Sequence, residues 1–146
     1  QMKVKNYIKV DFPSKSANES LARNIAACFA AQLDPTLEEL GDLKTAVSEA
    51  VTNCIVHAYP DDIGRICMKC RLYEDESIEV SIKDWGSGIY DVEKAREPLY
   101  TTGGDERSGM GFSIMESFMD KLKVKSQLNK GTTVTLRKKI TRKSEK

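Results

Sequence analysis

Five segments of the chain are predicted to be strands, and alternation of apolar and polar side chains is clearest in the first. In the first segment Ile8, Val10 and Phe12 alternate with polar residues, which is the pattern of a strand with one buried face. An acidic turn joins the second predicted strand to the third, and a turn with Asn129 and Gly131 joins the fourth to the fifth. The predicted strands span residues 3–12, 63–74, 77–84, 121–127 and 132–139.

Two segments repeat their apolar residues every three or four positions, as amphipathic helices do, and two shorter segments are also predicted to be helical. The predicted helices span residues 18–33, 36–58, 91–96 and 108–118. In the first helix the predicted apolar stripe falls at positions 21, 25, 28, 29 and 33. Thr36 begins the second helix and Glu39 follows three residues later, which predicts a capping box. The polar, glycine-containing residues 97–107 predict a loop.

The order of these elements predicts the fold class. Consecutive strands follow each other twice without an intervening helix, so we expect antiparallel pairing and an α+β fold rather than a doubly wound one. One sheet with helices packed on one face is the simplest arrangement. A length of 146 residues predicts a single domain over 1–146, and a chain of this size buries about 68–70% of its unfolded surface.

Composition narrows the class of protein. Apolar residues make up 40% and charged residues 31% of the chain, as in an ordinary globular protein. The longest apolar run, residues 25–31, is far shorter than the about 18 residues that suggest a membrane span. The first residues lack the apolar core of a signal peptide. We therefore expect a cytoplasmic protein that makes no membrane contact.

Charge is distributed unevenly along the chain. The net charge is +1, yet residues 137–146 hold six Lys or Arg against one Glu. A basic end of this kind, about residues 139–146, occurs in proteins that bind nucleic acid, but a solvated terminus explains it more simply. We expect no direct contact with DNA.

Four cysteines and one histidine limit the metal chemistry of the chain. Cys67 and Cys70 form a CxxC pattern on a predicted strand, where residues three apart point to opposite faces. That geometry does not suit a disulfide, and no second Cys or His pair completes a zinc site. We expect reduced cysteines that act as small apolar residues.

The second predicted helix has an apolar side and a polar row. Its apolar stripe comprises residues 47, 50, 51, 54, 55 and 58. Glu49, Asn53 and His57 form a row with i, i+4, i+8 spacing on another side, and Ala46 and Val56 on that side predict that it is sheltered. A sheltered Glu could act as a general base, and an Asn oxygen could ligate Mg²⁺. An exposed polar row is the alternative.

A carboxylate followed by two glycines ends the third predicted strand. The segment reads Asp84-Trp85-Gly86-Ser87-Gly88-Ile89. Glycines let the backbone approach a flat ligand closely, and the carboxylate could accept a hydrogen bond from an exocyclic amine. A turn alone also explains the pattern, because turns use Asp and Gly freely.

Two further patterns lie near the end of the chain. The last predicted helix opens with Arg107-Ser108-Gly109-Met110-Gly111. Amides at a helix start bind anions, and Arg107 adds a cation for a terminal phosphate. This is neither a Walker loop nor a dinucleotide fingerprint, since the required spacing and the third glycine are missing. Gly131-Thr132-Thr133 would be ordinary in a strand.

In this order, the ExxxN, DxGxG, GxG and GTT patterns resemble the N, G1 and G2 boxes of the GHKL superfamily of ATP-binding proteins. Longer stretches are similar to the anti-sigma F factors of endospore-forming bacteria, a family of serine-protein kinases. These stretches are residues 31–36, 47–53, 98–102 and 106–112, within a similarity that runs from about residue 5 to residue 138.

The resemblance implies a GHKL-type two-layer sandwich, in which a mixed, mainly antiparallel sheet carries helices on one face and a lid covers ATP or ADP. It implies that Glu49 is the catalytic base, that Asn53 holds Mg²⁺, and that Arg23 contacts partners. Residues of the adenine pocket would be Asp84, Gly86, Gly88, Ile89 and Thr132. Residues of the phosphate site would be Arg107, Ser108, Gly109, Met110 and Gly111.

The chain departs from the family pattern at two places. Ala58 stands where the family has Gly before a Tyr. The lid, residues 101–107, is about one residue shorter and has Gly103-Gly104 where Lys-Pro is expected, which would loosen it.

The function that the resemblance implies has two parts. The chain would bind and inhibit a sporulation sigma factor, and it would use Mg·ATP to phosphorylate a serine of an anti-anti-sigma factor, acting as a homodimer. A nucleotide-dependent binding module without catalysis is the alternative. A fragment of a histidine kinase is disfavoured, because the single histidine, His57, lies within the ATP-site helix.

Overall fold

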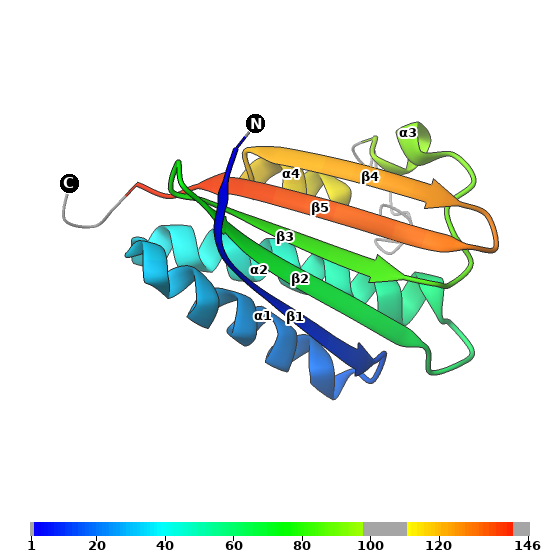
Figure 1. Ribbon diagram of the computed structural model, residues 1–146. Coiled ribbons are helices and arrows are strands. Elements are labelled where there is room, and N and C mark those ends of the chain that lie inside the picture. Colours follow the sequence, from blue (N-terminus) through cyan, green and yellow to red (C-terminus); the bar gives the residue numbers. More distant parts are fainter. Residues whose placement is uncertain (1, 98–110, 142–146) are drawn as a thin grey trace.

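The computed structural model describes residues 2–97 and 111–141, which build a sheet and a layer of helices on one of its faces (Figure 1). Five strands form the sheet in the order β1-β2-β3-β5-β4, and each neighbouring pair is antiparallel. The strands are β1 (Val4–Pro13), β2 (Arg65–Tyr73), β3 (Ser77–Asp84), β4 (Lys121–Gln127) and β5 (Gly131–Lys139). The α+β class predicted from the element order is confirmed.

Three helices, α1 (Ala17–Ala30), α2 (Leu37–Asn53) and α4 (Phe112–Phe118), lie behind the sheet in Figure 1 and leave its other face open. The short helix α3 (Val92–Ala95) lies beyond the edge strand β4. A 3-10 turn, Ala31–Leu33, extends α1, and a π-helical turn, Cys54–Ala58, extends α2. Single π turns often mark functional sites, and this one follows Asn53 directly.

The start of α2 is held as the sequence predicts. The hydroxyl of Thr36 accepts a hydrogen bond from the Glu39 N–H at 3.1 Å, and the Glu39 carboxylate accepts one from the Thr36 N–H at 2.9 Å. This capping box satisfies two backbone donors that the helix itself leaves unpaired. The other oxygen of Glu39 accepts from the Thr141 N–H at 2.8 Å, which joins the end of the described chain to the same helix.

The apolar core lies between the sheet and α1, α2 and α4. Alternate residues of β2 and β3 point into it, while α2 contributes the stripe predicted from its 3.6-residue period. The largest fully buried side chains include Phe112, Leu43, Ile66, Met68, Leu72 and Met115. Among the described residues, no helix has both the length and the apolar character needed to cross a bilayer.

The predicted apolar stripe of α1 is partly wrong. Leu21 is 50% exposed and Cys28 is exposed, whereas the fully buried face consists of Ala22, Ala26 and Ala30 with Phe29 and the following Leu33. Small residues face the core because α1 packs closely against α2. The prediction was wrong because it assigned the exposed Leu21 and Cys28 to the buried face.

The start of α4 also differs from the prediction. The helix begins at Phe112, and Gly111 before it has a left-handed φ of 66°, so the backbone is not helical at that glycine. The predicted start at Ser108 lies outside the described residues.

The cysteines behave as expected from their spacing. In the register of the sheet Cys67 stands opposite Asp11, and Cys70 stands opposite Ile8, so the two thiols lie on opposite faces of β2. All four cysteines are free. Within residues 2–97 and 111–141 no group of three or more His, Cys, Asp and Glu side chains could hold a metal ion.

Candidate nucleotide-binding site

The polar row of α2 lies beside a cavity at one end of the sheet. Glu49, Asn53 and His57 are each half-buried, and the last two line the cavity. Ala46 is buried as predicted, but Val56 is 37% exposed. The row is therefore sheltered at its Glu49 end and more open near His57.

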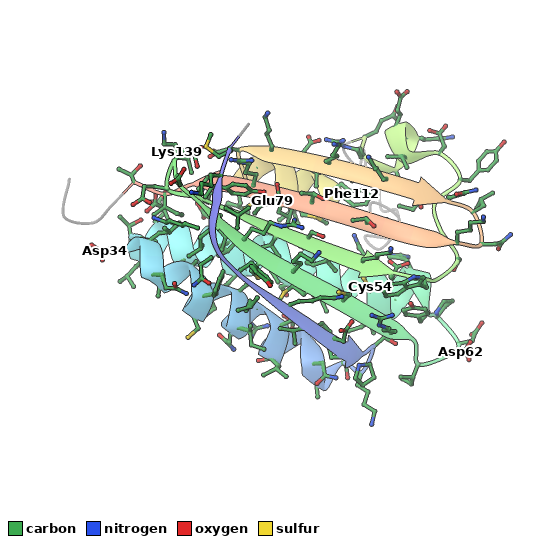
Figure 2. All side chains as sticks on the ribbon, in the orientation of Figure 1. Asp34, Cys54, Asp62, Glu79, Phe112 and Lys139 are labelled. Carbon is green, nitrogen blue, oxygen red and sulfur yellow. The ribbon has the colours of Figure 1, made fainter. Side chains whose placement is uncertain are left out.

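Five parts of the fold line the cavity. They are the end of α2 with its π turn, the end of β3, the loop that follows β3, the start of β5 and the start of α4. Its lining consists of Ala50, Asn53, Cys54, His57, Ala58, Asp84, Gly88, Ile89, Phe112, Thr132 and Val134. Cys54 and Phe112 are labelled in Figure 2. The polar patterns on α2, after β3 and on β5, which are far apart in the sequence, thus meet in one place.

Asp84 is the most buried charged group of this cavity, at 5% exposure. Its Oδ1 atom accepts hydrogen bonds from the backbone N–H groups of Gly86 at 3.0 Å and Thr132 at 3.2 Å. Its Oδ2 atom lies 3.5 Å from the Cys54 thiol, a weak donor. Burial raises the pKa of the Asp84 carboxyl, although the N–H donors oppose that shift. One oxygen is therefore fixed by the backbone, and the other can accept a stronger donor.

The glycines after Asp84 allow a close backbone approach. A Cβ on Gly86 would lie 2.3 Å from the Ala58 carbonyl oxygen and 2.6 Å from the Ala58 Cβ. Gly88 has a φ of +76°, and a Cβ there would lie 2.2 Å from the Gln127 carbonyl oxygen. The loop after β3 therefore packs directly on the π turn, and Ala58 fits at that contact because Gly86 has no side chain.

Two residues of the site were missed by the sequence analysis. Ser126 accepts a hydrogen bond from the Ile89 N–H at 2.7 Å, and its hydroxyl lies 2.7 Å from that of Thr132. It is the polar residue at an inward position of β4, after Leu122 and Val124, and that break in the pattern was a usable signal. Cys54 could not be found this way, because it lies within the apolar stripe of α2.

Glu49 lies against the start of α4. A Cβ on Gly111 would fall 2.2 Å from the Glu49 Oε2 atom, and Gly111 has a φ of +66°, a backbone conformation that favours glycine. Partial burial raises the pKa of the Glu49 carboxyl, and the negative charge of Glu19 on α1 raises it further. A carboxylate with a raised pKa is better matched to accept a proton near neutral pH.

Arg23 lies on α1 and is held in place by its own helix. Its Nη1 atom donates to both carboxylate oxygens of Glu19, at 2.7 and 2.6 Å. Arg23 and Glu49 line one groove between α1 and α2. The structure thus brings together Arg23, Glu49, Asn53, Asp84 and Thr132 around one end of α2. Arg107, Ser108, Gly109 and Met110 lie outside the described residues.

Comparison with protein families agrees with this geometry. A model of the histidine kinase-like ATPase domain matches residues 12–138. Proteins named anti-sigma F factor are similar over almost the whole chain. That of Caldanaerobacter subterraneus subsp. tengcongensis is 54% identical over 97% of this chain and 99% of its own length. That of Clostridium acetobutylicum is 51% identical over 94% of this chain and 96% of its own length.

Solved structures share the fold at low sequence identity. The RsbU and RsbW domains of a Mycobacterium tuberculosis protein superpose with a TM-score of 0.69 at 18% identity, over 94% of this chain and 33% of that one. The histidine kinase domain of a blue-light activated kinase from Erythrobacter litoralis gives a TM-score of 0.57 at 20% identity, over 84% of this chain and 61% of that one. The GHKL-type sandwich predicted from the sequence is confirmed. With its family-model match and its close relatives, the chain belongs to the anti-sigma F factor family, whose fold is the histidine kinase-like ATPase domain.

Proposed function

We propose that the chain is an anti-sigma factor that binds a sporulation sigma factor and uses Mg·ATP to phosphorylate a serine of an anti-anti-sigma factor. The family supports ATP-dependent, kinase-type activity. The observation that carries the catalytic part is the position of Glu49, a half-buried carboxylate with a raised pKa, against the start of α4 beside the cavity. A site that only binds nucleotide has no need of a base there.

Asp84 is the group that would recognise the nucleobase. Its Oδ2 atom accepts from the weak Cys54 thiol, so an exocyclic amine of adenine offers a better donor. Gly86, Gly88 and Ile89 would form one wall of the pocket, and Thr132 would lie beside the base. A ring that donates a hydrogen bond fits this cavity, whereas one that presents a carbonyl to Asp84 does not.

The phosphates and Mg²⁺ would lie toward the start of α4. Asn53 offers an amide oxygen on the same row as Glu49. Mg²⁺ commonly keeps several waters and takes its other ligands from one or two side chains and from substrate phosphates, so a single Asn53 ligand fits it. The ion would neutralise phosphate charge. From the sequence, Gly111 and residues 108–110 would supply amides to the phosphates, and Arg107 would meet the terminal one.

In the transfer step, Glu49 would accept the proton of the serine hydroxyl. The serine oxygen forms a bond to the γ-phosphorus while the bond from that phosphorus to the β,γ-bridging oxygen breaks, which gives phosphoserine and ADP. Positioning and charge neutralisation provide most of the rate in such reactions.

The partner and assembly assignments rest on the outer side of α1 and on β1. Arg23 would contact the protein partners, since it lies on the surface beside Glu49. A homodimer could form through β1, an edge strand of the sheet, and the neighbouring side of α1, where Leu21 is 50% exposed and Cys28 is exposed. Long edge strands and exposed apolar side chains are the features that association covers.

Phosphate transfer tests the proposed activity. The chain is incubated with Mg·ATP and its cognate anti-anti-sigma protein, and the product is mapped by mass spectrometry. We expect one phosphoserine on the acceptor and none when its serine is replaced by Ala. Nucleotide binding without any transfer would favour the binding-module alternative.

A further inference from the structure

A groove between α1 and α2 opens on the side of Glu49 away from the nucleotide cavity. Its volume is about 380 Å³, and its lining consists of Arg23, Gly41, Lys44, Thr45, Ser48 and Glu49. The nucleotide cavity begins one turn further along α2, at Ala50 and Asn53. Glu49 therefore lies at the end of the groove that is nearer to the nucleotide cavity.

The groove residues of α2 form one continuous stripe. Gly41, Lys44, Thr45, Ser48 and Glu49 follow i, i+3, i+4, i+7, i+8 spacing, which places them on one face of a helix. A Cβ on Gly41 would meet no atom within 4 Å, so the stripe begins at an open end. This polar row continues the Glu49–Asn53–His57 row toward the start of α2.

Several polar groups of the stripe have no hydrogen-bond or ion-pair partner among the described residues. Among residues 2–97 and 111–141, the structure gives the Lys44 ammonium and the hydroxyls of Thr45 and Ser48 no hydrogen-bond or ion-pair partner. Asp42, on the neighbouring face of α2, is instead paired with Lys138 at 3.7 Å. Residues 14–62, which form α1 and α2, contain eight Asp or Glu but only three Lys or Arg. Lys44 is thus a localised positive charge in an acidic layer.

We propose that this groove receives the acceptor polypeptide, with the serine hydroxyl at Glu49 and an acidic side chain of the acceptor at Lys44. The inference rests on the proposed kinase function. If Glu49 takes the proton, the hydroxyl must approach from the side that the nucleotide does not fill, and the groove is that side. Thr45 and Ser48 supply hydrogen bonds to the backbone between the two anchors.

Helix geometry sets the spacing of the recognised residues. Glu49 lies five positions after Lys44, which is about 7.5 Å along the helix axis at about 1.5 Å per residue. An extended chain covers about 3.3 Å per residue. The acidic residue of the acceptor therefore lies about two positions from its serine.

Charge reversal at Lys44 tests this contact. With the cognate anti-anti-sigma protein as acceptor, Lys44→Glu should raise KM for the acceptor at least tenfold and leave kcat and ATP affinity within twofold of wild type. Lys15→Glu makes the same charge change at the exposed residue before α1, outside the groove, and serves as the matched control. Replacing the acidic residue about two positions from the acceptor serine by Lys should restore KM for Lys44→Glu.

A second variant keeps the test independent of charge. Gly41→Leu adds a side chain where open space exists, so the fold should keep or gain stability while the acceptor binds at least tenfold more weakly. Binding is measured in the ADP-bound state with the serine-to-Ala acceptor, so it does not need catalysis. If the acceptor with its serine intact binds but is not phosphorylated, the kinase function is contradicted. The binding measurements on Gly41→Leu would then still test the groove.

Four outcomes would overturn the assignment. One is an equal change in acceptor KM or binding for Lys44→Glu and Lys15→Glu. Another is a fall in kcat for Lys44→Glu with no change in acceptor KM. The third is acceptor affinity that Gly41→Leu leaves unchanged, and the fourth is no acceptor binding by the wild type.

Discussion

At the scale of single residues, the two oxygens of Asp84 have different tasks. The Oδ1 atom accepts two backbone N–H groups, which fixes the carboxylate between the ends of β3 and β5. Within the described residues the Oδ2 atom accepts only from the Cys54 thiol. The backbone contacts explain the orientation of this side chain, and the free capacity of Oδ2 explains how it could recognise an amine.

Replacing Asp84 by Asn should weaken ATP binding and leave the fold intact. The Asn oxygen can still accept the two backbone N–H groups, but its NH₂ group would then face the adenine amine, donor against donor. We expect ATP affinity to fall about 10- to 100-fold, as for the loss of a hydrogen bond to a charged group, measured by titration calorimetry. Asp91→Asn on the exposed start of α3 is the control. Equal ATP affinity for wild type and Asp84→Asn would contradict the role of Asp84.

Nucleotide binding should also weaken in mild acid. Burial raises the pKa of Asp84, and an amine needs the ionised carboxylate as its acceptor. ADP affinity should therefore decline as the pH falls through that raised pKa, at a higher pH than an ordinary Asp would give. For stability the sign is opposite, because the folded state favours the protonated carboxyl. The contribution of Asp84 to stability is greatest below its ordinary pKa and is lost as the pH rises toward the raised one.

A pH titration of ADP affinity in wild type tests the predicted weakening of binding in mild acid. Unfolding followed in parallel by circular dichroism shows whether the protein is still folded at each pH. Affinity that stays constant down to the pKa of an unperturbed Asp would contradict the predicted weakening.

Each pattern taken alone left an ordinary turn, strand or exposed polar row as the alternative, and it was the resemblance of their order to the GHKL superfamily that predicted Glu49, Asn53, Asp84 and Thr132 at one site. Ser126 and Cys54 were missed for different reasons. Ser126 is recognisable as a polar residue at an inward position of β4, but its role also depends on its contacts with Ile89 and Thr132, which lie on other segments. Cys54 is both part of the apolar stripe and part of the cavity.

At the scale of elements, the site depends on close contacts between the ends of helices and strands. Gly131 has a φ of +125°, and a Cβ there would lie 2.1 Å from the Asp84 carbonyl oxygen. This contact brings the start of β5 against the end of β3 and places the Thr132 N–H near the carboxylate. Gly41, in contrast, lies within α2 and has no atom near its missing Cβ.

The two glycines should therefore respond oppositely to the same substitution. Gly131→Ala should destabilise the fold by at least about 1–3 kcal/mol from backbone strain alone. Gly41→Ala should stabilise it by about 0.5–1 kcal/mol, because Ala is the better residue in a helix interior. Urea unfolding of both variants and wild type gives the two values. A stable Gly131→Ala protein would show that the turn does not need the left-handed backbone conformation.

Most element boundaries were predictable because each has a local chemical cause. The strand β3 was predicted at its observed bounds, and the capping box fixed the start of α2. The buried face of α1 was not predictable in this way. The short distance between α1 and α2 places the alanines, rather than the larger apolar residues, in the core. The π turn after Asn53 was also invisible, since its sequence continues the helical period.

At the scale of the whole molecule, the sheet has one face covered by helices and two edge strands, β1 and β4 (Figure 1). Lysines alternate along β4 at positions 121, 123 and 125, which is a common protection of an edge strand against association. The end of β1 is joined to α1, which carries the exposed Leu21, because the Asn18 amide donates to the Pro13 carbonyl at 3.0 Å. This asymmetry favours β1 and α1 as the side where a second copy would bind.

Leu21→Asp should shift the chain toward monomer if that side forms the dimer. An exposed apolar side chain becomes a charge that a buried interface disfavours, while the folded monomer loses little because Leu21 is already half exposed. Sedimentation velocity over a range of concentrations measures the change, with Leu128→Asp on the β4–β5 turn as control. Wild-type protein that sediments as a monomer throughout would rule out the dimer.

The role of Glu49 as the base of a phosphate-transfer site can be measured in a single-turnover assay. The rate of transfer from Mg·ATP to the acceptor is compared among wild type, Glu49→Gln and the exposed control Glu38→Gln, with ATP affinity measured for each. We predict that Glu49→Gln slows transfer about 10²- to 10⁴-fold, as expected for a general base, and binds ATP within twofold of wild type. Wild-type transfer by Glu49→Gln would contradict the account.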